Sequence, residues 1–368
     1  MSDGDAVAAA VDRAFPGATI RDRDPVETGN RKRTVVVGLE DDDGTRSVVV
    51  QVAPDERGLR TEAALGCAVG ARTDVPVPAV LAGGTYDLGD GGFLVTEHVS
   101  GDDLHERFVR LDDAERERVA RSLGRALAQV HGAFEFDGFG PVGLDEPLDV
   151  GDGSDADGGG DDRWTAVLEA TDPGSLLRVR ADAAGDGVAD AGDTADTADV
   201  VGNERWPAWF GRHADAGLRA LPDGFDDLRP RLREAVEAAR ARLPATPEAR
   251  LYPWDLRPGN ALVADGRVSA VLDWGEPLAA APGLSLAKAE HLVCDWYVED
   301  GARLRRAFRA GYRSERPLPS VPDAYRLVAV IRSAVDGDGT VTRPRYPELT
   351  GEDAVAFHRD RLLAALDG

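Results

Sequence analysis

The chain has 368 residues, which is long enough for two lobes with separate hydrophobic cores. Its formal net charge of −24 argues against nucleic acid as a partner, because binding a phosphate backbone requires a basic surface. No stretch approaches the roughly 18 apolar residues of a membrane span, and the first residues lack the pattern of a signal peptide. We therefore expect a cytoplasmic protein with no membrane partner.

The composition is also unusual in its basic residues. Of the 43 lysines and arginines, only Lys32 and Lys288 are lysines. An acidic chain that is poor in lysine suggests a halophilic protein, because concentrated salt screens the repulsion between its carboxylates. Cys67 and Cys294 are far apart in sequence and show no metal-ligand spacing, so we expect both to be reduced, buried and structural.

The first hundred residues have the pattern of a small sheet with helices. A short helix is expected at 5–15, and apolar runs at 34–39 and 47–53 flank an Asp/Gly turn, as in a β-hairpin. A helix is expected at 60–72 and a further strand at 93–99. These elements predict a small antiparallel lobe that ends near residue 101.

The rest of the chain is mostly helical in pattern. Asp112 and Glu115 form a capping box, followed by an apolar stripe that includes Val119, Leu123 and Leu127. Further helices are predicted at 205–221, 228–243, 284–298, 302–312, 323–334 and 352–366. Two acidic, low-complexity insertions, around 145–163 and 181–203, have too few apolar residues to bury, and we expect them to be disordered.

Residues 250–277 carry the strongest chemical signal. Asp255 and Asn260 are five positions apart in an Asp-Leu-x-x-x-Asn loop, and a short predicted hairpin then leads to Asp273 in Asp-Trp-Gly. Phosphoryl transfer requires a group that accepts the proton of the attacking hydroxyl and oxygen ligands for a divalent metal. The pattern therefore favours Asp255 as the base and both Asn260 and Asp273 as Mg²⁺ ligands.

This stretch resembles the motif of the aminoglycoside phosphotransferase and choline kinase family, His-Gly-Asp-Leu-x-Pro-x-Asn followed by Ile/Leu-Asp-Trp/Phe-Gly. The matching residues are Leu256, Pro258, Gly259, Asn260, Leu272, Asp273, Trp274 and Gly275. The resemblance implies an α+β, two-lobed, protein-kinase-like fold. Residues 1–100 would form the small nucleotide-binding lobe, with an antiparallel sheet and one helix, and residues 101–368 the larger, mostly α catalytic and substrate lobe.

The resemblance also implies a function. We expect ATP and Mg²⁺ as cofactors and, as acceptor, a hydroxyl of a small molecule such as an aminoglycoside, choline or a sugar. The family's phosphate-holding lysine aligns with Gln51, and the acid that pairs with this lysine aligns with Glu62. No nearby lysine replaces it in sequence, so we expect an amide facing a carboxylate. The sequence leaves open whether Arg57, Arg60 or bound cations compensate. Glu97, His98 and Val99 are the predicted hinge residues that bind the adenine edge.

Several positions depart from the family pattern. Besides Gln51, Pro253 and Trp254 replace His-Gly, and Ser285 stands where the family has an Asp that steadies the catalytic loop. The alternative hypothesis is therefore a catalytically impaired, kinase-like binding or regulatory protein. Retention of all three candidate base and metal residues favours phosphotransfer.

A substrate pocket is a weaker prediction. Glu290, Asp295 and Trp296 follow the catalytic stretch and could bind an amine or a sugar by charge and stacking. The equally weighted alternative is a solvated acidic face. The sequence leaves the acceptor, the choice between ATP and GTP, and the oligomeric state open.

Overall fold

A computed structural model describes residues 3–26, 32–42, 44–85, 91–144, 159–180, 205–336 and 339–367. Within these limits the chain divides into two compact units. The first unit comprises residues 1–101, 143–178 and 269–276, and the second comprises 102–142, 179–268 and 277–368. Segments 143–178 and 269–276 therefore belong to the first unit, although the sequence places them in the C-terminal lobe.

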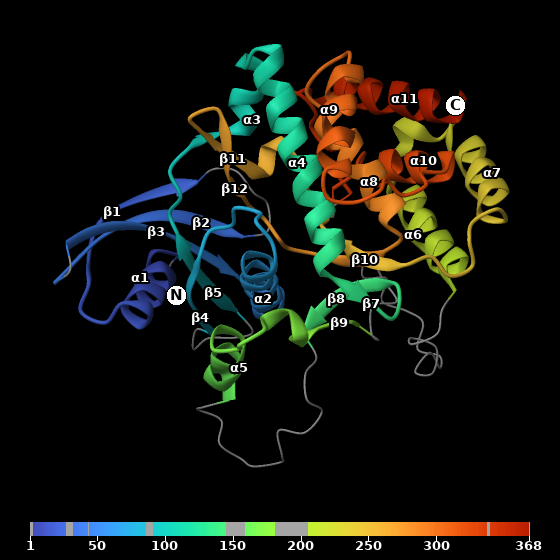
Figure 1. Ribbon diagram of the computed structural model, residues 1–368. Helices are drawn as coiled ribbons and strands as arrows, with labels where there is room; N and C mark the ends of the chain where they lie inside the picture. The colour runs from blue at the N-terminus through green and yellow to red at the C-terminus, as the bar shows by residue number, and fades with distance from the viewer. Residues whose placement is uncertain are drawn as a thin grey trace. The chain divides into compact units, whose positions relative to one another are not determined.

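The first unit is built on a five-stranded antiparallel sheet with the strand order β1–β2–β3–β5–β4 (Figure 1). Its strands are β1 (Thr19–Val26), β2 (Arg33–Asp41), β3 (Gly44–Ala53), β4 (Val80–Thr85) and β5 (Gly92–Glu97). The predicted hairpin is present as β2 and β3, with Val35 opposite Val50. β1 and β4 were not predicted from the sequence. β1 is a polar, largely exposed edge strand, so it lacks the alternating apolar pattern that reveals a half-buried strand.

One face of this sheet forms the core of the first unit. Val35 and Val37 of β2 and Val48 and Val50 of β3 pack with the apolar side of α1 (Asp3–Ala14). Because neighbouring side chains of a strand point to opposite faces, Gln51 lies on the face that α1 does not cover. Lys32, which precedes β2, reaches the candidate site from this same face.

The first unit also contains α2, α5 and the short helix η2 (Pro173–Leu176). α2 (Glu56–Arg72) begins at Asp55, whose carboxylate caps the backbone N–H of Gly58. α5 (Gly159–Leu168) lies beside β4, where Trp164 packs so closely that a Cβ on Gly83 would come within 2.1 Å of its ring. The prediction of disorder over 145–163 is therefore wrong for 159–163, since the buried Trp164 anchors a helix there. Residues 145–158 and 181–203 lie outside the described residues.

The second unit is dominated by helices, as predicted. They are α3 (Leu104–Arg107), η1 (Phe108–Arg110), α4 (Asp113–Ala133), α6 (Trp206–Ala220), η3 (Asp223–Phe225), α7 (Arg229–Arg240), η4 (Pro258–Asn260), α8 (Pro282–Glu290), η5 (His291–Asp295), α9 (Ala302–Arg313), α10 (Asp323–Ile331) and α11 (Gly351–Asp367). The predicted capping box at Asp112 and Glu115 is confirmed. The helix expected at 284–298 ends earlier, because its α-helical part gives way to a π-helical turn, η5.

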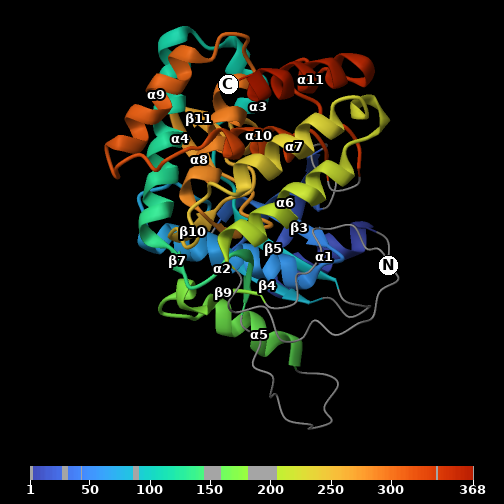
Figure 2. The ribbon, with the colours of Figure 1, turned by 90° about the vertical axis from the view of Figure 1, so that its right-hand side faces the viewer.

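Close helix packing shapes this unit. Figure 1 shows α4 and α9 side by side, and a Cβ on Gly124 of α4 would lie 2.0 Å from the carbonyl oxygen of Phe308. Figure 2 shows α6 and α7 side by side, and both contribute to a core with α8 and α10. None of the described helices combines the length and the apolarity that a membrane span needs.

Short strands link these helices. A five-stranded sheet has the order β7–β10–β13–β8–β9, and a three-stranded sheet has the order β12–β11–β6. Their bounds are β6 (Asp102–Asp103), β7 (Glu135–Phe136), β8 (Gly140–Leu144), β9 (Leu177–Val179), β10 (Ala249–Tyr252), β11 (Ala261–Ala264), β12 (Arg267–Val271) and β13 (Leu278–Ala280). The predicted hairpin is β11 and β12, and its turn holds Asp265 and Gly266 at positive φ. This hairpin separates the predicted catalytic loop from the Asp-Trp-Gly segment.

Candidate phosphotransfer site

An ion-paired triad lies in the first unit. The ammonium of Lys32 donates to both carboxylate oxygens of Glu62, at 2.8 and 2.7 Å, and to Oδ1 of Asp273, at 2.9 Å. Lys32 precedes β2, Glu62 lies in the second turn of α2, and Asp273 follows β12. Three segments far apart in the sequence therefore place one cation between two acids.

The triad corrects the expectation that an amide faces Glu62. Gln51 pairs with Thr34 across the β2–β3 ladder, and Lys32 is two residues before Thr34. Side chains two residues apart share a face, and diagonal neighbours across a ladder are within reach of a long side chain. Lys32 therefore reaches Glu62 from the neighbouring strand, on the same face as Gln51. The predicted pair of a neutral amide with Glu62 is therefore wrong, because Glu62 pairs with the ammonium of Lys32.

The two carboxylates of the triad stabilise the charged form of Lys32. Burial opposes the charged form of Lys32, but the carboxylates of Glu62 and Asp273 outweigh this effect and raise the pKa of Lys32. Burial raises the pKa of Glu62, and the ammonium of Lys32 opposes this rise. A backbone hydrogen bond from Trp274 also stabilises the Glu62 carboxylate. Lys32 therefore keeps its positive charge at neutral pH.

Asp273 adopts a conformation that residues with side chains seldom take. Its φ is 57°, in the left-handed region, and such strain is often kept where it positions a functional group. Gly275 lies next to the triad, since a Cβ there would be in ordinary contact with Oδ1 of Asp273 at 3.4 Å and with Oε2 of Glu62 at 3.6 Å. The Asp273 side chain remains 46% exposed, so its carboxylate can still accept a further cation.

The predicted catalytic loop belongs to the second unit. Asn260 ends the short helix η4, and its amide nitrogen donates to the backbone oxygen of Asp255 at 2.9 Å. This bond leaves the amide oxygen of Asn260 as the acceptor atom for a ligand. The carboxylate of Asp255 lies 3.3 Å from Nε of Arg257 and is 29% exposed, so it is accessible to a substrate.

The side chain of Tyr297 contacts this loop at Gly259. A Cβ on Gly259 would lie 2.7 Å from the Tyr297 hydroxyl, which explains the need for glycine. The hydroxyl lies 3.0 Å from Nδ1 of His105 and accepts a hydrogen bond from the Gly259 backbone. Burial raises the pKa of Tyr297 to about 12, so the hydroxyl keeps its proton at neutral pH. Sequence reasoning did not find this contact, which depends on the tertiary fold.

The residues present suit a Mg²⁺ ion in chemical type. Asn260 and Asp273 offer the hard oxygen atoms that Mg²⁺ prefers. In the described part of the chain, no group of three or more His, Cys, Asp or Glu side chains is arranged to hold a metal. A histidine- or cysteine-based centre is thus absent from these residues, and Asn260 and Asp273 as Mg²⁺ ligands remain a prediction.

The predicted hinge residues follow β5 in the first unit. Glu97 is its last residue and pairs with Val48, and its backbone N–H donates to Ala79 at 2.8 Å. The side chains of Glu97 and His98 are exposed, and Val99 is half-buried. Their role in binding adenine remains a prediction.

The residues predicted to line a substrate pocket lie elsewhere than expected. Glu290 is 1% exposed, and its carboxylate binds Arg309 at 2.5 and 2.9 Å. Asp295 binds Arg305 at 2.5 Å, and Trp296 is 2% exposed. Arginine therefore neutralises both acids inside the second unit, and the role of these three residues in binding a substrate remains a prediction.

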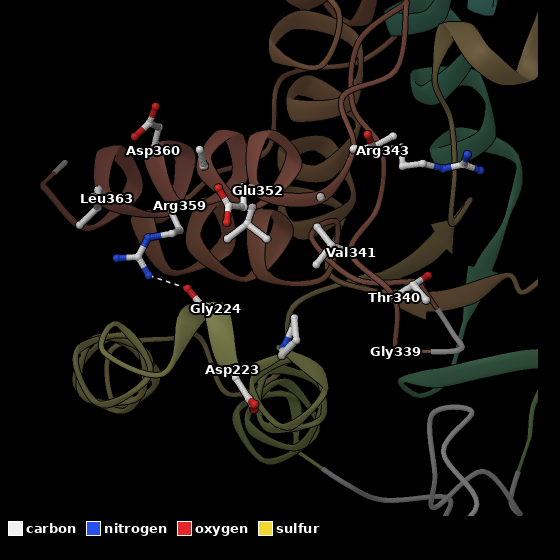
Figure 3. Close-up of a pocket in the computed structure, with 15 residues that line it drawn as sticks. Asp223, Gly224, Gly339, Thr340, Val341, Arg343, Glu352, Arg359, Asp360 and Leu363 are labelled. Atoms are coloured by element: carbon white, nitrogen blue, oxygen red, sulfur yellow. Dashed lines mark hydrogen bonds between the residues drawn. The ribbon is translucent and has the colours of Figure 1, made fainter.

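A broad hollow of about 960 Å³ also lies in the second unit, between η3 and α11 (Figure 3). Its wall carries charges of both signs, including Arg343, Glu352 and Asp360, and Arg359 donates to the Gly224 oxygen at 2.7 Å. None of the predicted site residues, all of which are described, lines this hollow.

Comparison with known proteins identifies the family. The model of the phosphotransferase enzyme family matches residues 23–327. No protein with curated function matches the sequence. Among solved structures, a thermostable mutant of the aminoglycoside phosphotransferase APH(4)-Ia, in a ternary complex with AMP-PNP and hygromycin B, is similar. It shares 16% identity at a TM-score of 0.60, with 98% of each chain covered.

Two further structures share the fold. The GDP complex of aminoglycoside 2'-phosphotransferase-IIIa has 12% identity and a TM-score of 0.54, with 100% of this chain and 99% of that chain covered. A putative fructosamine-3-kinase from Haemophilus somnus 129PT has 12% identity and a TM-score of 0.51, with 98% and 96% covered. At these identities the structures establish a common kinase-like fold, and the match over residues 23–327 establishes more: the chain belongs to the phosphotransferase enzyme family.

Proposed function

We propose that the protein transfers the terminal phosphoryl group of ATP to a hydroxyl of a small molecule, in a reaction that depends on Mg²⁺. The single observation that carries this proposal is the triad of Lys32, Glu62 and Asp273. It supplies a fixed cation at the place where the sequence has lost the family's usual lysine. Membership of the phosphotransferase enzyme family supports phosphoryl transfer to a small molecule.

Each residue has a defined task in this proposal. Lys32, oriented by Glu62, donates charge-assisted hydrogen bonds to phosphate oxygens. Asn260 and Asp273 provide oxygen ligands for Mg²⁺, which when bound neutralises charge on the phosphate oxygens. Asp255 accepts the proton of the attacking hydroxyl. Glu97, His98 and Val99 contact the base of the nucleotide.

The alternative, a kinase-like binding protein without turnover, loses one of its main supports. It rested on Gln51, and Lys32 now provides the cation that Gln51 lacks. Pro253 and Trp254 still favour it, because they replace the family's His-Gly next to the proposed base.

A lysine exchange tests the proposal. Binding of ATP is measured by calorimetry, with and without Mg²⁺, for the wild type, Lys32→Gln, and the double variant Lys32→Gln/Gln51→Lys. A charge-assisted hydrogen bond contributes about 1.5–3 kcal/mol, so Lys32→Gln should weaken ATP binding by about 10- to 100-fold. The double variant should regain much of this loss, because position 51 shares the face of Lys32.

Arg46→Gln is the matched control. Arg46 is an exposed cation of β3 that pairs with Asp41, so its loss changes the net charge equally but should leave ATP binding intact. Transfer from radiolabelled ATP is then tested with hygromycin B, choline and a sugar amine as acceptors. Unchanged ATP binding in Lys32→Gln, or Mg²⁺-independent binding that survives Asp273→Asn, would overturn the proposal.

A further inference from the structure

The second lysine of the chain occupies an unusual position. Lys288 lies in α8 and is 2% exposed, although lysine is almost never fully buried without a partner. Arginine has taken 41 of the 43 basic positions, and the other lysine is the cation of the triad described above. Lys288 is therefore the second lysine that could act in the proposed phosphotransfer.

Trp254 provides one partner of Lys288. The ammonium nitrogen lies 3.2 Å from the centroid of the indole ring, which is a close cation–π contact. The guanidinium of Arg332 contacts the same ring at 5.1 Å. Trp254 directly precedes Asp255, in the place where the family motif has glycine. A glycine offers no ring, so this contact is tied to the departure from the motif.

Charged groups of both signs act on Lys288. The ionisable groups that act on it are Asp255, Arg332, Arg257 and Asp336. Burial lowers the pKa of Lys288 to about 7, and the carboxylate of Asp255 opposes this fall most strongly. Arg332 and Arg257 reinforce the fall, and Asp336 opposes it. Asp255 is thus the acid that most favours the charged form of Lys288.

The residues at the family's usual supporting positions cannot supply this charge. Ser285, which replaces the supporting Asp, has its hydroxyl 3.1 Å from Nε2 of His131, and Nδ1 of His131 lies 2.8 Å from the Tyr312 hydroxyl. Burial lowers the pKa of His131 to about 3, so this network is neutral. Lys288 follows Ser285 by three residues, which is close to one helical turn.

We propose that Lys288, seated on the indole ring of Trp254, is the positioning residue for Asp255. Its ammonium attracts the Asp255 carboxylate, and its contact with the ring restrains the start of the catalytic loop. The pair replaces the histidine and aspartate that the family motif uses there. The inference rests on the proposed function only in calling Asp255 the catalytic base.

A spectroscopic experiment tests the coupling on the intact chain. Because the protein has only two lysines, labelling with [ε-¹³C]lysine gives two side-chain signals, which the spectrum of Lys32→Arg assigns. The titration of the Lys288 signal is compared in the wild type, Asp255→Asn and Trp254→Leu. Asp227→Asn, which removes an exposed carboxylate paired with Arg359 in the same unit, is the matched control.

Asp255→Asn should lower the titration midpoint of Lys288 by about one pH unit, since an opposite charge nearby shifts a pKa by about 1–3 units. Trp254→Leu should remove the ring-current displacement of the Lys288 signal, and Asp227→Asn should change neither. An unchanged midpoint in Asp255→Asn would overturn the proposal. Asp255→Asn keeps the shape of a partly exposed side chain, so this outcome does not depend on a buried substitution.

Steady-state kinetics distinguish a failure of this inference from a failure of the proposed function. If an acceptor is phosphorylated, Lys288→Met should lower kcat by about tenfold or more while the KM for ATP stays the same, and Lys288→Arg should recover part of the loss. A lower kcat without any change in the Lys288 titration of Asp255→Asn would indicate a merely structural lysine. If no acceptor is phosphorylated, the proposed function fails, whereas the spectroscopic result still decides the Lys288–Asp255 coupling.

Discussion

Replacing Lys288 by methionine should stabilise the protein, and the gain should depend on pH. Burial lowers the pKa of Lys288 from its ordinary value of 10.5 to about 7. One pKa unit corresponds to about 1.4 kcal/mol, so keeping the amine charged inside the fold costs up to about 5 kcal/mol. The attraction of the Trp254 ring for the ammonium offsets part of this cost.

The direction of the pH dependence follows from the protons that each state binds. Between about pH 7 and pH 10.5 the unfolded chain keeps the Lys288 proton and the folded chain has lost it. The free energy of unfolding of the wild type should therefore rise with pH in this window, by about 1.4 kcal/mol per pH unit from this residue. Below pH 7 both states are protonated, and the full cost is present.

Urea unfolding of the wild type and Lys288→Met between about pH 6 and pH 9 measures this effect. The stability advantage of the variant should be greatest near pH 6 and should shrink by about 2–3 kcal/mol at pH 9. Arg303→Gln, a change of an exposed arginine, should give a difference that does not vary with pH. A constant difference between the wild type and Lys288→Met over this range would refute a buried lysine that titrates near neutrality.

Three further changes test the packing, the loop support and the role of charge. Gly124→Ala should destabilise the protein by about 1–3 kcal/mol, because the added Cβ would meet the Phe308 carbonyl oxygen at 2.0 Å. Gly132→Ala, at the exposed end of the same helix, should instead stabilise the protein by up to about 1 kcal/mol. Thermal unfolding of both variants measures this contrast. Tyr297→Phe removes the hydroxyl that accepts from the Gly259 backbone, and turnover should fall more than ATP affinity in steady-state kinetics; equal losses would contradict its role in supporting the loop. Because the net charge is −24, the melting temperature should rise with KCl concentration in calorimetry, and a constant value would argue against halophilic adaptation.

The two candidate halves of the site were predictable to different degrees. Asp255, Asn260 and Asp273 follow one another within a short stretch, so their order and spacing point to phosphotransfer chemistry without tertiary information. The ion pairs of Lys32 span 30 residues to Glu62 and 241 residues to Asp273. No local pattern marks such a residue, and alignment with the family directs attention to Gln51 instead.

The burial of individual acidic residues could not be predicted from the sequence either. Glu290 and Asp295 look like any two of the 67 acids in the chain. Their burial against Arg309 and Arg305 depends on how α9 packs beside η5, which only the folded chain specifies. The same holds for Trp164, whose burial beside β4 turns part of a low-complexity stretch into a helix.

The sequence by itself determined the N-terminal hairpin, the helical second half and the order and spacing of Asp255, Asn260 and Asp273. These follow from short-range periodicity, capping and spacing, which act within a few residues of each other. The tertiary structure alone decided which cation serves Glu62, and it placed the ammonium of the other lysine over the ring of Trp254. The physical reason is that a lysine side chain spans neighbouring strands or a helical turn, so its charge acts where the fold brings acids, whatever its position in the chain.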